Sequence, residues 1–347
     1  MKILVLAGGI SNEREVSLSS GTSITNALKK LGHKAAMLDL FFGIEDLKKL
    51  EDLYNDNNQL TEYKVSKKTP NILSLYKKRS SLSKSEIGPN VIEACKNCDI
   101  VFLALHGGIG ENGKLQSLLD IYDIKYTGTD SISSALAMHK AYSKIIFNNA
   151  NLPCAKSFHL RKEDKILLPK EYNLNYPVVV KICSGGSSIG VFISNNDNEY
   201  YSYIKECFKL DNEILVEEYI NGREFAIPVI ASKAMPIIEI IPKNGWFDYE
   251  HKYQDNVTHE ICPAQIDKNL ALTMQESAKK SIELLGIKVY ARSDFRVDEN
   301  NNIYCIEVNT LPGMTTASLL PKSCMTNGMS YEQLCEMIIL ESLKKYK

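Results

Sequence analysis

The stretch Ala291–Asn309, ARSDFRVDENNNIYCIEVN, decides how the chain is interpreted. Two runs of alternating polar and apolar residues flank the polar segment DENNN, a pattern typical of a β-hairpin. Pairing the runs about the centre of this loop places Asp294 opposite Glu307 and Arg292 opposite Asn309. Side chains alternate across a strand, so these four residues are expected to share one face. The other face is then an apolar core face, with Phe295, Val297, Tyr304, Ile306 and Val308.

Two carboxylates that face each other across a hairpin are unfavourable as a bare pair. At ~4 Å and an effective dielectric of about 20, like charges repel by about 4 kcal/mol. A divalent cation reverses that sign, and the two carboxylates with the amide oxygen of Asn309 are hard ligands that suit Mg²⁺. The pattern therefore predicts a magnesium site at Asp294, Glu307 and Asn309. The alternative is a solvated strand face with an Arg–Asp ion pair.

The composition limits the class of protein. A chain of 347 residues suggests two or three domains, and 41 basic against 42 acidic side chains argue against nucleic-acid or membrane-surface binding. Nine scattered cysteines, an odd count, favour reduced thiols and a cytosolic location. Cys95 and Cys98 lack two further ligands nearby and are interpreted as structural. No stretch approaches the ~20 apolar residues of a membrane span, and the N-terminus does not resemble a signal peptide.

Periodicity along the chain predicts an α/β start followed by a strand-rich second half. Lys2–Ala7 is expected to be a buried strand, followed by a helix that ends at Gly32 and a second strand at 34–40. The uneven, polar residues 41–90 are expected to form a surface insertion or a mobile segment. Residues 131–149 should be largely helical. Further strands are expected at 177–182, 191–194, 213–218, 224–230 and 234–241, a long loop at 242–264, and a helix at 270–285.

The loop SGGSSIG, residues 184–190, lies between two apolar strands and is a candidate phosphate loop. Glycines let backbone N–H groups approach a phosphate, and Ser187 and Ser188 add hydroxyl donors. No Gly-Lys-Ser/Thr follows, so it is not a Walker loop. A plain hairpin turn is the alternative. Lys181, at the end of the preceding strand, is either a solvated strand end or a counter-charge for phosphate.

Three other segments carry candidate residues. Lys252 and Tyr253 lie in the long loop, which is either a lid that excludes water or a mobile polar segment. Glu13 follows two glycines without the dinucleotide spacing G-x-G-x-x-G. It suits a substrate ammonium group, or it is an ordinary first-turn glutamate. The turn before Ser318 offers donors to a carboxylate, or simply caps a helix.

Together, seven segments resemble the D-alanine–D-alanine ligase family of the ATP-grasp superfamily. They are GGISNEREVSL, LHGGIGENG, KICSGGSSIGV, VEEYINGREF, YEHKY, ARSDF and EVNTLPGMTTASL, and they occur in the family's order over nearly the whole chain. The resemblance implies an ATP-grasp fold, with an N-terminal Rossmann-like parallel α/β domain and two antiparallel-sheet subdomains that clamp ATP. The expected boundaries are 1–130, with the insertion at about 41–90, then 131–220 and 221–347.

The resemblance also implies an activity and a set of partners. ATP would phosphorylate the carboxylate of one D-alanine, and the amine of a second D-alanine would attack the acyl phosphate to give D-alanyl-D-alanine for peptidoglycan synthesis. The enzyme would be a cytoplasmic homodimer with two Mg²⁺ ions, or Mn²⁺ instead, held by Asp294, Glu307 and Asn309.

Matched residue by residue, the family implies roles in substrate binding and catalysis. Glu13, Ser187 and Tyr253 would form a hydrogen-bonded triad, with Glu13 also holding the first ammonium group. Arg292 and Gly313 would complete an oxyanion hole. The residues expected to line the pocket of the two substrates include His106, Ser318 and Leu319.

The ATP site is implied in the same way. Lysines would neutralise the phosphates, a hinge would bind the adenine, a glutamate would bind the ribose, and an aromatic ring would pack on the base. The residues in these roles are Lys140, Lys181, Lys252, Ser188, Glu217, Tyr219, Ile220, Glu224 and Trp246.

The chain departs from the family pattern at a few positions. Gly185 stands where many members carry a glutamate, His139 where an aspartate is common, and Ala291 where a glycine is frequent. Tyr253 and Leu319 favour D-alanine as second substrate, although an apolar pocket rejects the hydroxyl of D-serine by only about a hundredfold. The alternatives are a D-alanine–D-serine ligase or another ATP-grasp carboxylate–amine ligase. A non-catalytic nucleotide-binding protein and a nicotinamide dehydrogenase are the more distant rivals.

Overall fold

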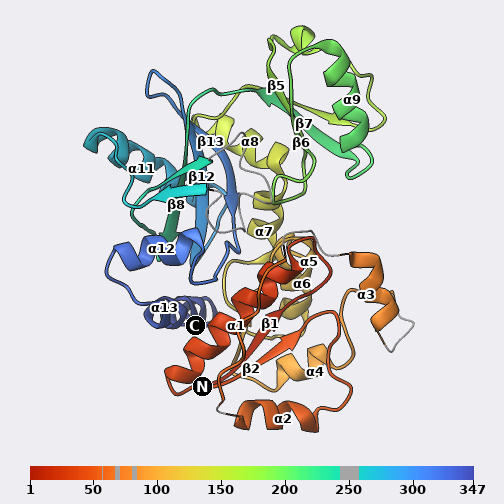
Figure 1. The fold of residues 1–347 in the computed structure, drawn as a ribbon, viewed down its shortest axis with the longest axis vertical. Helices are drawn as coiled ribbons and strands as arrows, with labels where there is room; N and C mark the ends of the chain where they lie inside the picture. The colour runs from red at the N-terminus through yellow and green to blue at the C-terminus, as the bar shows by residue number, and fades with distance from the viewer. Residues whose placement is uncertain (57, 67–70, 80–83, 243–257) are drawn as a thin grey trace.

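Three β-sheets organise the chain, which a computed structural model describes over residues 1–56, 58–66, 71–79, 84–242 and 258–347. Figure 1 shows the N-terminal sheet at one end of the long axis, the sheet of β5, β6 and β7 at the other end, and the sheet of β8, β12 and β13 between them. Both termini lie beside the N-terminal sheet. The middle sheet therefore lies between the other two.

The N-terminal sheet is parallel, in the order β2-β1-β3. Its strands are β1 (Lys2–Ala7), β2 (Lys34–Asp39) and β3 (Ile100–Leu103). Residues 3–7 are fully buried, as expected for a parallel strand covered on both faces. The surrounding helices are α1 (Arg14–Lys30), α2 (Lys48–Asn55), α3 (Ile72–Lys78), α4 (Val91–Lys96), α5 (Gly108–Glu111) and α6 (Lys114–Ile121).

The segment 41–90 is more than a polar insertion. Leu50 and Tyr54 on α2 are 1 % and 2 % exposed and belong to the N-terminal core. Their four-residue spacing places them on one face of a short helix. Phe41 is also fully buried, and Ile44, Leu47 and Ile87 pack against the same core. The polar runs of the segment concealed these contacts in the sequence.

The second sheet is antiparallel, in the order β4-β7-β5-β6. Its strands are β4 (Ser157–Arg161), β5 (Val178–Ile182), β6 (Val191–Ser194) and β7 (Glu213–Glu218), with α9 (Asp197–Cys207) packed on β5 and β6. The helix expected at 131–149 is broken into α7 (Ser131–Met138) and α8 (Lys140–Asn149). The break is at His139, whose φ of −89° and ψ of 95° are extended and which pairs with Ser184 as an isolated β-bridge.

The third sheet has the order β11-β10-β8-β12-β13, with β9 paired to β8. Its strands are β8 (Arg223–Ile230), β9 (Lys233–Ala234), β10 (Ile238–Pro242), β11 (Thr258–Ile261), β12 (Tyr290–Val297) and β13 (Ile303–Asn309), and α11 (Lys268–Leu284) packs on it. The strand expected at 234–241 is interrupted near Pro236, which has no N–H to donate to a ladder. Part of the loop expected at 242–264 is strand β11.

The C-terminal helices α12 (Leu319–Thr326) and α13 (Tyr331–Leu343) return to the N-terminal sheet. Leu334, Ile338 and Ile339 are fully buried in the same core as Leu4 and Ile24. The two ends of the chain are thus joined by one apolar core.

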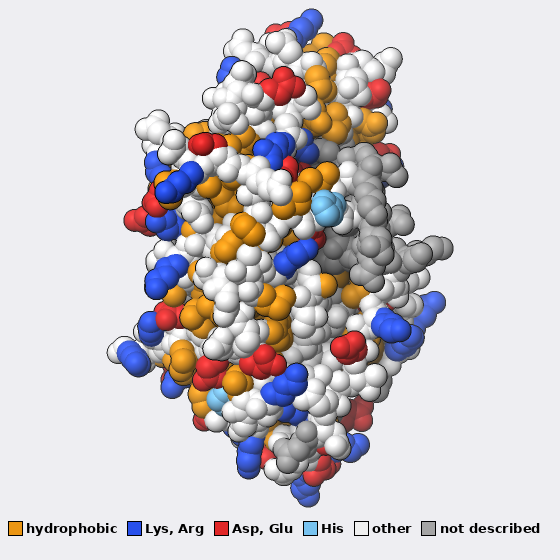
Figure 2. All heavy atoms as spheres, turned by 60° about the vertical axis from the view of Figure 1, so that its left-hand side comes forward, with side chains coloured by type: hydrophobic (Ala, Val, Ile, Leu, Met, Phe, Trp, Pro, Cys, Tyr) orange, Lys and Arg blue, Asp and Glu red, His pale blue; other side chains and the backbone are white. Residues whose placement is uncertain are grey.

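None of the helices in the described ranges has both the length and the apolar composition needed to cross a bilayer. On the face drawn in Figure 2, basic and acidic side chains are interspersed.

Candidate active site

The hairpin of β12 and β13 has the predicted register at its functional end. Asp294 pairs with Glu307, and Arg292 pairs with Asn309. Arg292 donates to both carboxylate oxygens of Asp294 at 2.7 Å, and the Asn309 amide donates to Asp294 Oδ2 at 3.0 Å. The predicted facing of Asp294 and Glu307 is therefore present, together with the Arg292–Asp294 ion pair that belonged to the alternative interpretation.

A bulge between Asp294 and Phe295 changes the other half of the hairpin. Beyond it, Phe295 pairs with Cys305 and Val297 with Ile303. Cys305 and Ile303 therefore join the core, while Tyr304 and Ile306 line a cavity beside Glu307. The expectation that Tyr304 and Ile306 face the core was wrong, because a bulge adds one residue to one strand and reverses the alternation after it.

Lys140 links this hairpin to the glycine loop. The Lys140 ammonium is 3.1 Å from Glu307 Oε2 and donates to the carbonyl oxygen of Gly185 at 2.7 Å. Its backbone N–H donates to the Cys183 carbonyl oxygen at 3.0 Å, because the helix is broken one residue earlier. Lys140 is thus the first residue of α8 and projects between two sheets.

The glycine loop also reaches the N-terminal domain. Ser187 donates a 2.6 Å hydrogen bond to Glu13 Oε1. Ser187 and Ser188 have φ values of 53° and 59°, in the left-handed region. A Cβ on Gly186 would come within 2.9 Å of the Glu13 carboxylate. The Glu13–Ser187 half of the predicted triad is therefore assembled.

A buried charge cluster lies behind the loop. The Glu217 carboxylate forms an ion pair with Lys181 and lies 2.6 Å from the Lys144 ammonium. Although burial opposes its ionisation, Lys144 and Lys181 hold the pKa of Glu217 at about 2. Burial, with the charges of Lys144 and Lys140, lowers the pKa of Lys181 even beside this carboxylate. The three side chains together carry one net positive charge.

Arg296 organises the far end of the cavity. Its guanidinium donates to the Ile220 carbonyl oxygen at 3.0 Å and lies 3.1 Å from Glu224 Oε2. It also lies 5.6 Å from the centre of the Tyr219 ring. The predicted hinge residues Tyr219 and Ile220 and the predicted ribose ligand Glu224 are therefore held together by one arginine.

The N-terminal domain contributes His106 and the buried Glu111. The His106 ring contacts the Leu311 carbonyl oxygen through Nδ1 and Ser20 Oγ through Nε2, each at 2.9 Å, and burial lowers the pKa of His106. Glu111 accepts from the backbone N–H groups of Gly107 and Leu311. Burial, with the nearby Glu13, raises the pKa of Glu111 to about 7.

The turn before α12 completes the cleft. Ser318 Oγ lies 2.8 Å from Thr315 Oγ1 and accepts from the Thr315 N–H at 3.1 Å. A Cβ on Gly313 would meet Ser318 Oγ at 2.8 Å, so a larger residue there would displace the Ser318 side chain. Leu319 begins α12 and is 8 % exposed.

These residues line two adjoining cavities. The smaller cavity is lined by the charge cluster and the hinge. The larger one, of about 880 Å³, is lined by Glu13, His106, Arg292, Gly313 and residues 315–319. The residues that line both cavities are Lys140, Gly185, Gly186, Ser187 and Glu307. A ligand that spans both would place its middle between Lys140, the loop and the acidic hairpin.

Comparison with known proteins identifies the family. The model of the D-ala D-ala ligase N-terminus matches residues 2–129, and the model of the D-ala D-ala ligase C-terminus matches residues 146–340. The chain belongs to the D-alanine–D-alanine ligase family.

Full-length relatives agree with this assignment. The D-alanine–D-alanine ligase of Pediococcus pentosaceus is 44 % identical over 349 residues, covering 100 % of this chain and 99 % of the relative. That of Lacticaseibacillus casei is 40 % identical over 350 residues, covering 100 % and 97 %.

Solved structures agree as well. The Bacillus anthracis D-alanine–D-alanine ligase complexed with ATP has a TM-score of 0.77 at 29 % identity, covering 99 % of this chain and 98 % of that one. A second structure of the Bacillus anthracis enzyme has a TM-score of 0.78 at 31 % identity. The expected mixed α/β, ATP-grasp fold is confirmed.

Not every residue expected from the ligase family is in the described ranges. Trp246, Lys252 and Tyr253, expected at the adenine, the phosphates and the triad, lie outside them.

Three side chains were missed in the sequence. Lys144 lies four residues after Lys140 and so on the same helical face, Arg296 continues the alternation of Arg292 and Asp294, and Glu111 follows His106 in the same loop. These spacings can be seen in the sequence, but they do not tell whether a charged side chain is buried against a partner or exposed to solvent.

Proposed function

We propose that this protein uses ATP to join two D-alanine molecules into D-alanyl-D-alanine, a peptidoglycan precursor. The observation that carries the proposal is the junction of the two cavities, where Lys140, the glycine loop and the Asp294–Glu307 pair meet. The family assignment and the ATP in the Bacillus anthracis relative support it.

ATP would lie with its base in the smaller cavity. There the backbone of Tyr219 and Ile220 would bind the adenine, and Glu224, held by Arg296, would bind the ribose hydroxyls. The phosphates would extend toward Lys140, Lys181 and Ser188. Positively charged side chains in a site with little water stabilise the negative charge that spreads over a transferred phosphoryl group.

The hairpin would hold Mg²⁺ next to those phosphates. Asp294 and Glu307 are carboxylates, and exchanging O and N of the Asn309 amide would turn its oxygen toward the same side. These are hard oxygen donors of the kind that Mg²⁺ prefers, and Arg292 and Lys140 now balance the charge of the two carboxylates. When bound, Mg²⁺ would neutralise the phosphate oxygens.

The reaction would occur in the larger cavity. The Glu13 carboxylate would bind the ammonium group of the first D-alanine, whose carboxylate oxygen would attack the γ-phosphorus and release ADP. The amine of the second D-alanine would lose a proton and form the C–N bond, and the C–O bond to phosphate would break. Arg292 and the Gly313 N–H would face the oxyanion formed between these steps.

The second substrate would be selected near the start of α12. Ser318 would bind its carboxylate, and Leu319 would present an apolar surface to a methyl group. D-Serine is the closest competitor, since its extra hydroxyl is rejected only weakly by an apolar pocket.

A phosphate-release assay with D-alanine, D-serine, D-lactate and L-alanine tests the proposal. We expect release to be fastest with D-alanine, together with one D-alanyl-D-alanine per ATP by mass spectrometry. Phosphate release that no D-alanine concentration stimulates would overturn it. The homodimer and the cytoplasmic location stay predictions, and sedimentation of the pure protein tests the first.

A further inference from the structure

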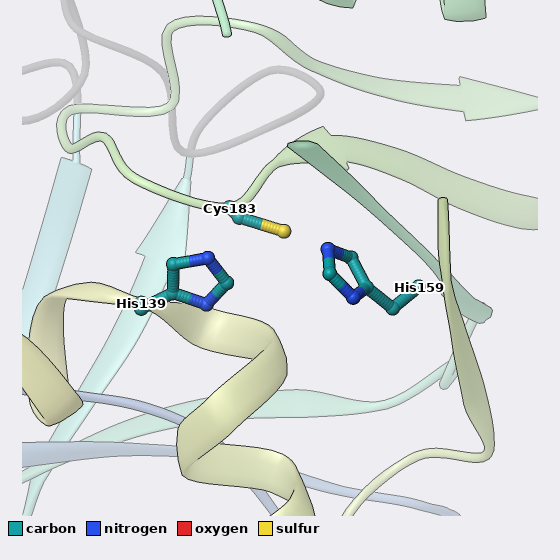
Figure 3. A group of neighbouring side chains, drawn as sticks. All are labelled: His139, His159 and Cys183. Atoms are coloured by element: carbon teal, nitrogen blue, oxygen red, sulfur yellow. The ribbon is translucent and has the colours of Figure 1, made fainter. Parts of the chain in front are cut away.

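Three side chains that can bind a metal lie close together, and none of them has a role in the proposed reaction. They are His139, His159 and Cys183, and one ligand atom from each lies within 4.8 Å of the other two. Figure 3 shows the two imidazole rings and the thiol pointing toward one another. His139 comes from the break between α7 and α8, His159 from β4, and Cys183 directly follows β5.

The backbone around this cluster is fixed by strand pairing. β4 and β5 both pair with β7. The Cys183 N–H donates to the Glu213 carbonyl oxygen at 3.0 Å, and the Lys140 N–H donates to the Cys183 carbonyl oxygen at the same distance. Ligands on rigid elements need little reorganisation before they bind a metal.

A carboxylate stands next to both rings. Glu213 Oε2 is 2.6 Å from His139 Nε2 and 3.3 Å from His159 Nε2, and its other oxygen is 3.2 Å from Arg161 Nε. Two neutral imidazoles, one thiolate and one carboxylate carry two negative charges. That sum balances a divalent cation.

We propose that His139, His159 and Cys183, with Glu213 as the hydrogen-bond partner of the two imidazoles, form a binding site for Zn²⁺ or a similar borderline-soft divalent metal. Imidazole nitrogen and thiolate donors are typical of zinc rather than magnesium. This chemistry separates the site from the all-oxygen hairpin of Asp294.

Binding exchanges protons for the metal. Burial raises the pKa of the Cys183 thiol to about 12, so the sulfur is protonated before the metal binds. The thiol proton is released as the metal–sulfur bond forms. His139 Nε2 can donate its proton to Glu213, so Nδ1 is the nitrogen left for the metal, in place of its long, 3.4 Å contact with the Tyr142 N–H.

The position of the site gives it a structural consequence for the active site. His139 directly precedes Lys140, and Cys183 is followed by the loop residues 184–190. A metal held by both fixes the start of α8 against the base of the glycine loop. The bound metal would therefore restrict the movement of the residues that we expect to bind phosphate.

Cobalt substitution of the full-length protein tests the site. Chelator-treated protein is titrated with Co²⁺ in saturating Mg²⁺, which occupies the oxygen site. We expect one Co²⁺ to bind with a thiolate-to-cobalt absorption band, and one equivalent of Zn²⁺ to displace it. Cys183→Ser and His159→Gln should each abolish the band, and Glu213→Gln should weaken binding by roughly 10- to 100-fold.

Cys98→Ser is the matched control, because Cys95 and Cys98 are the competing thiol pair. It should leave the band unchanged. Absence of the band in the wild type, its survival in Cys183→Ser, or its loss in Cys98→Ser would each overturn the proposal. Circular dichroism of the metal-free variants checks their folding, and His159→Gln, which retains every cysteine, decides the outcome if Cys183→Ser does not fold.

Discussion

Replacing Lys144 by methionine tests whether the charge cluster behind the glycine loop stabilises the protein. Methionine keeps most of the side-chain volume and removes the charge that lies 2.6 Å from Glu217. The Lys144 and Glu217 side chains are only 3 % and 8 % exposed. Lys181 alone would then balance a carboxylate that now has two cations.

The size of the effect follows from the pKa of Glu217. A pKa held at about 2 instead of 4.5 corresponds to about 3 kcal/mol of stabilisation. Removing one partner of a buried ion pair typically costs ~3–5 kcal/mol. Because the folded-state pKa lies below the unfolded one, this stabilisation is fully present above about pH 4.5 and is lost as the pH falls toward 2. We expect Lys144→Met to lose roughly 3 kcal/mol at pH 7.

Urea unfolding followed by circular dichroism measures the loss, with Lys209→Met as the matched control. Lys209 lies at the same 2.6 Å from Glu206, but these side chains are 66 % and 48 % exposed. An exposed pair contributes less than about 1 kcal/mol. If the two variants lose equal stability, burial does not control the strength of the Glu217 cluster.

Three further substitutions test the proposed roles. Glu307→Gln should abolish ligation and leave the melting temperature nearly unchanged. Glu299→Gln, the same change at an exposed residue of the same hairpin, should leave turnover unaltered. Phosphate release measures the turnover of both variants, and turnover by Glu307→Gln would contradict the metal site. Ser187→Ala removes a hydrogen bond to a carboxylate worth ~1.5–3 kcal/mol, so kcat/KM for D-alanine should fall by roughly 10- to 100-fold, and an unchanged value would exclude the triad. The pKa of Glu111 in the folded protein is raised to about 7, so its neutral form stabilises the protein below about pH 4.5 and that contribution is lost as the pH rises through 7. Glu111→Gln should therefore make the free energy of unfolding depend less on pH between 4.5 and 7. An equal dependence on pH in the variant and the wild type would refute the assignment.

The hairpin shows how far alternation in a sequence can predict a site. Polar residues at every second position were enough to predict that Asp294 faces Glu307. The same alternation failed for Tyr304 and Ile306, because the bulge between Asp294 and Phe295 reverses it in the other half of the hairpin. A bulge leaves no mark in a pattern of polar and apolar residues, so the face of the residues beyond it could not be predicted.

The buried partners were less predictable for a different reason. Lys144, Arg296 and Glu111 each bind groups that are distant in sequence, and a sequence shows a charge without showing its partner. Helical spacing could have placed Lys144 beside Lys140, but only the fold brings Glu217 between Lys144 and Lys181. The type of site was therefore predictable, while its internal electrostatics depended on tertiary packing.

The break at His139 is the feature that connects the parts of the site. In an unbroken helix the Lys140 N–H would donate to Leu136 four residues earlier, as helical geometry requires. Here it donates to the Cys183 carbonyl oxygen instead, so the hydrogen bond lost from the helix is replaced by one to the strand that leads into the glycine loop. The Lys140 side chain can then reach both Gly185 and Glu307. One extended residue thereby couples the loop of the second sheet to the acidic hairpin of the third.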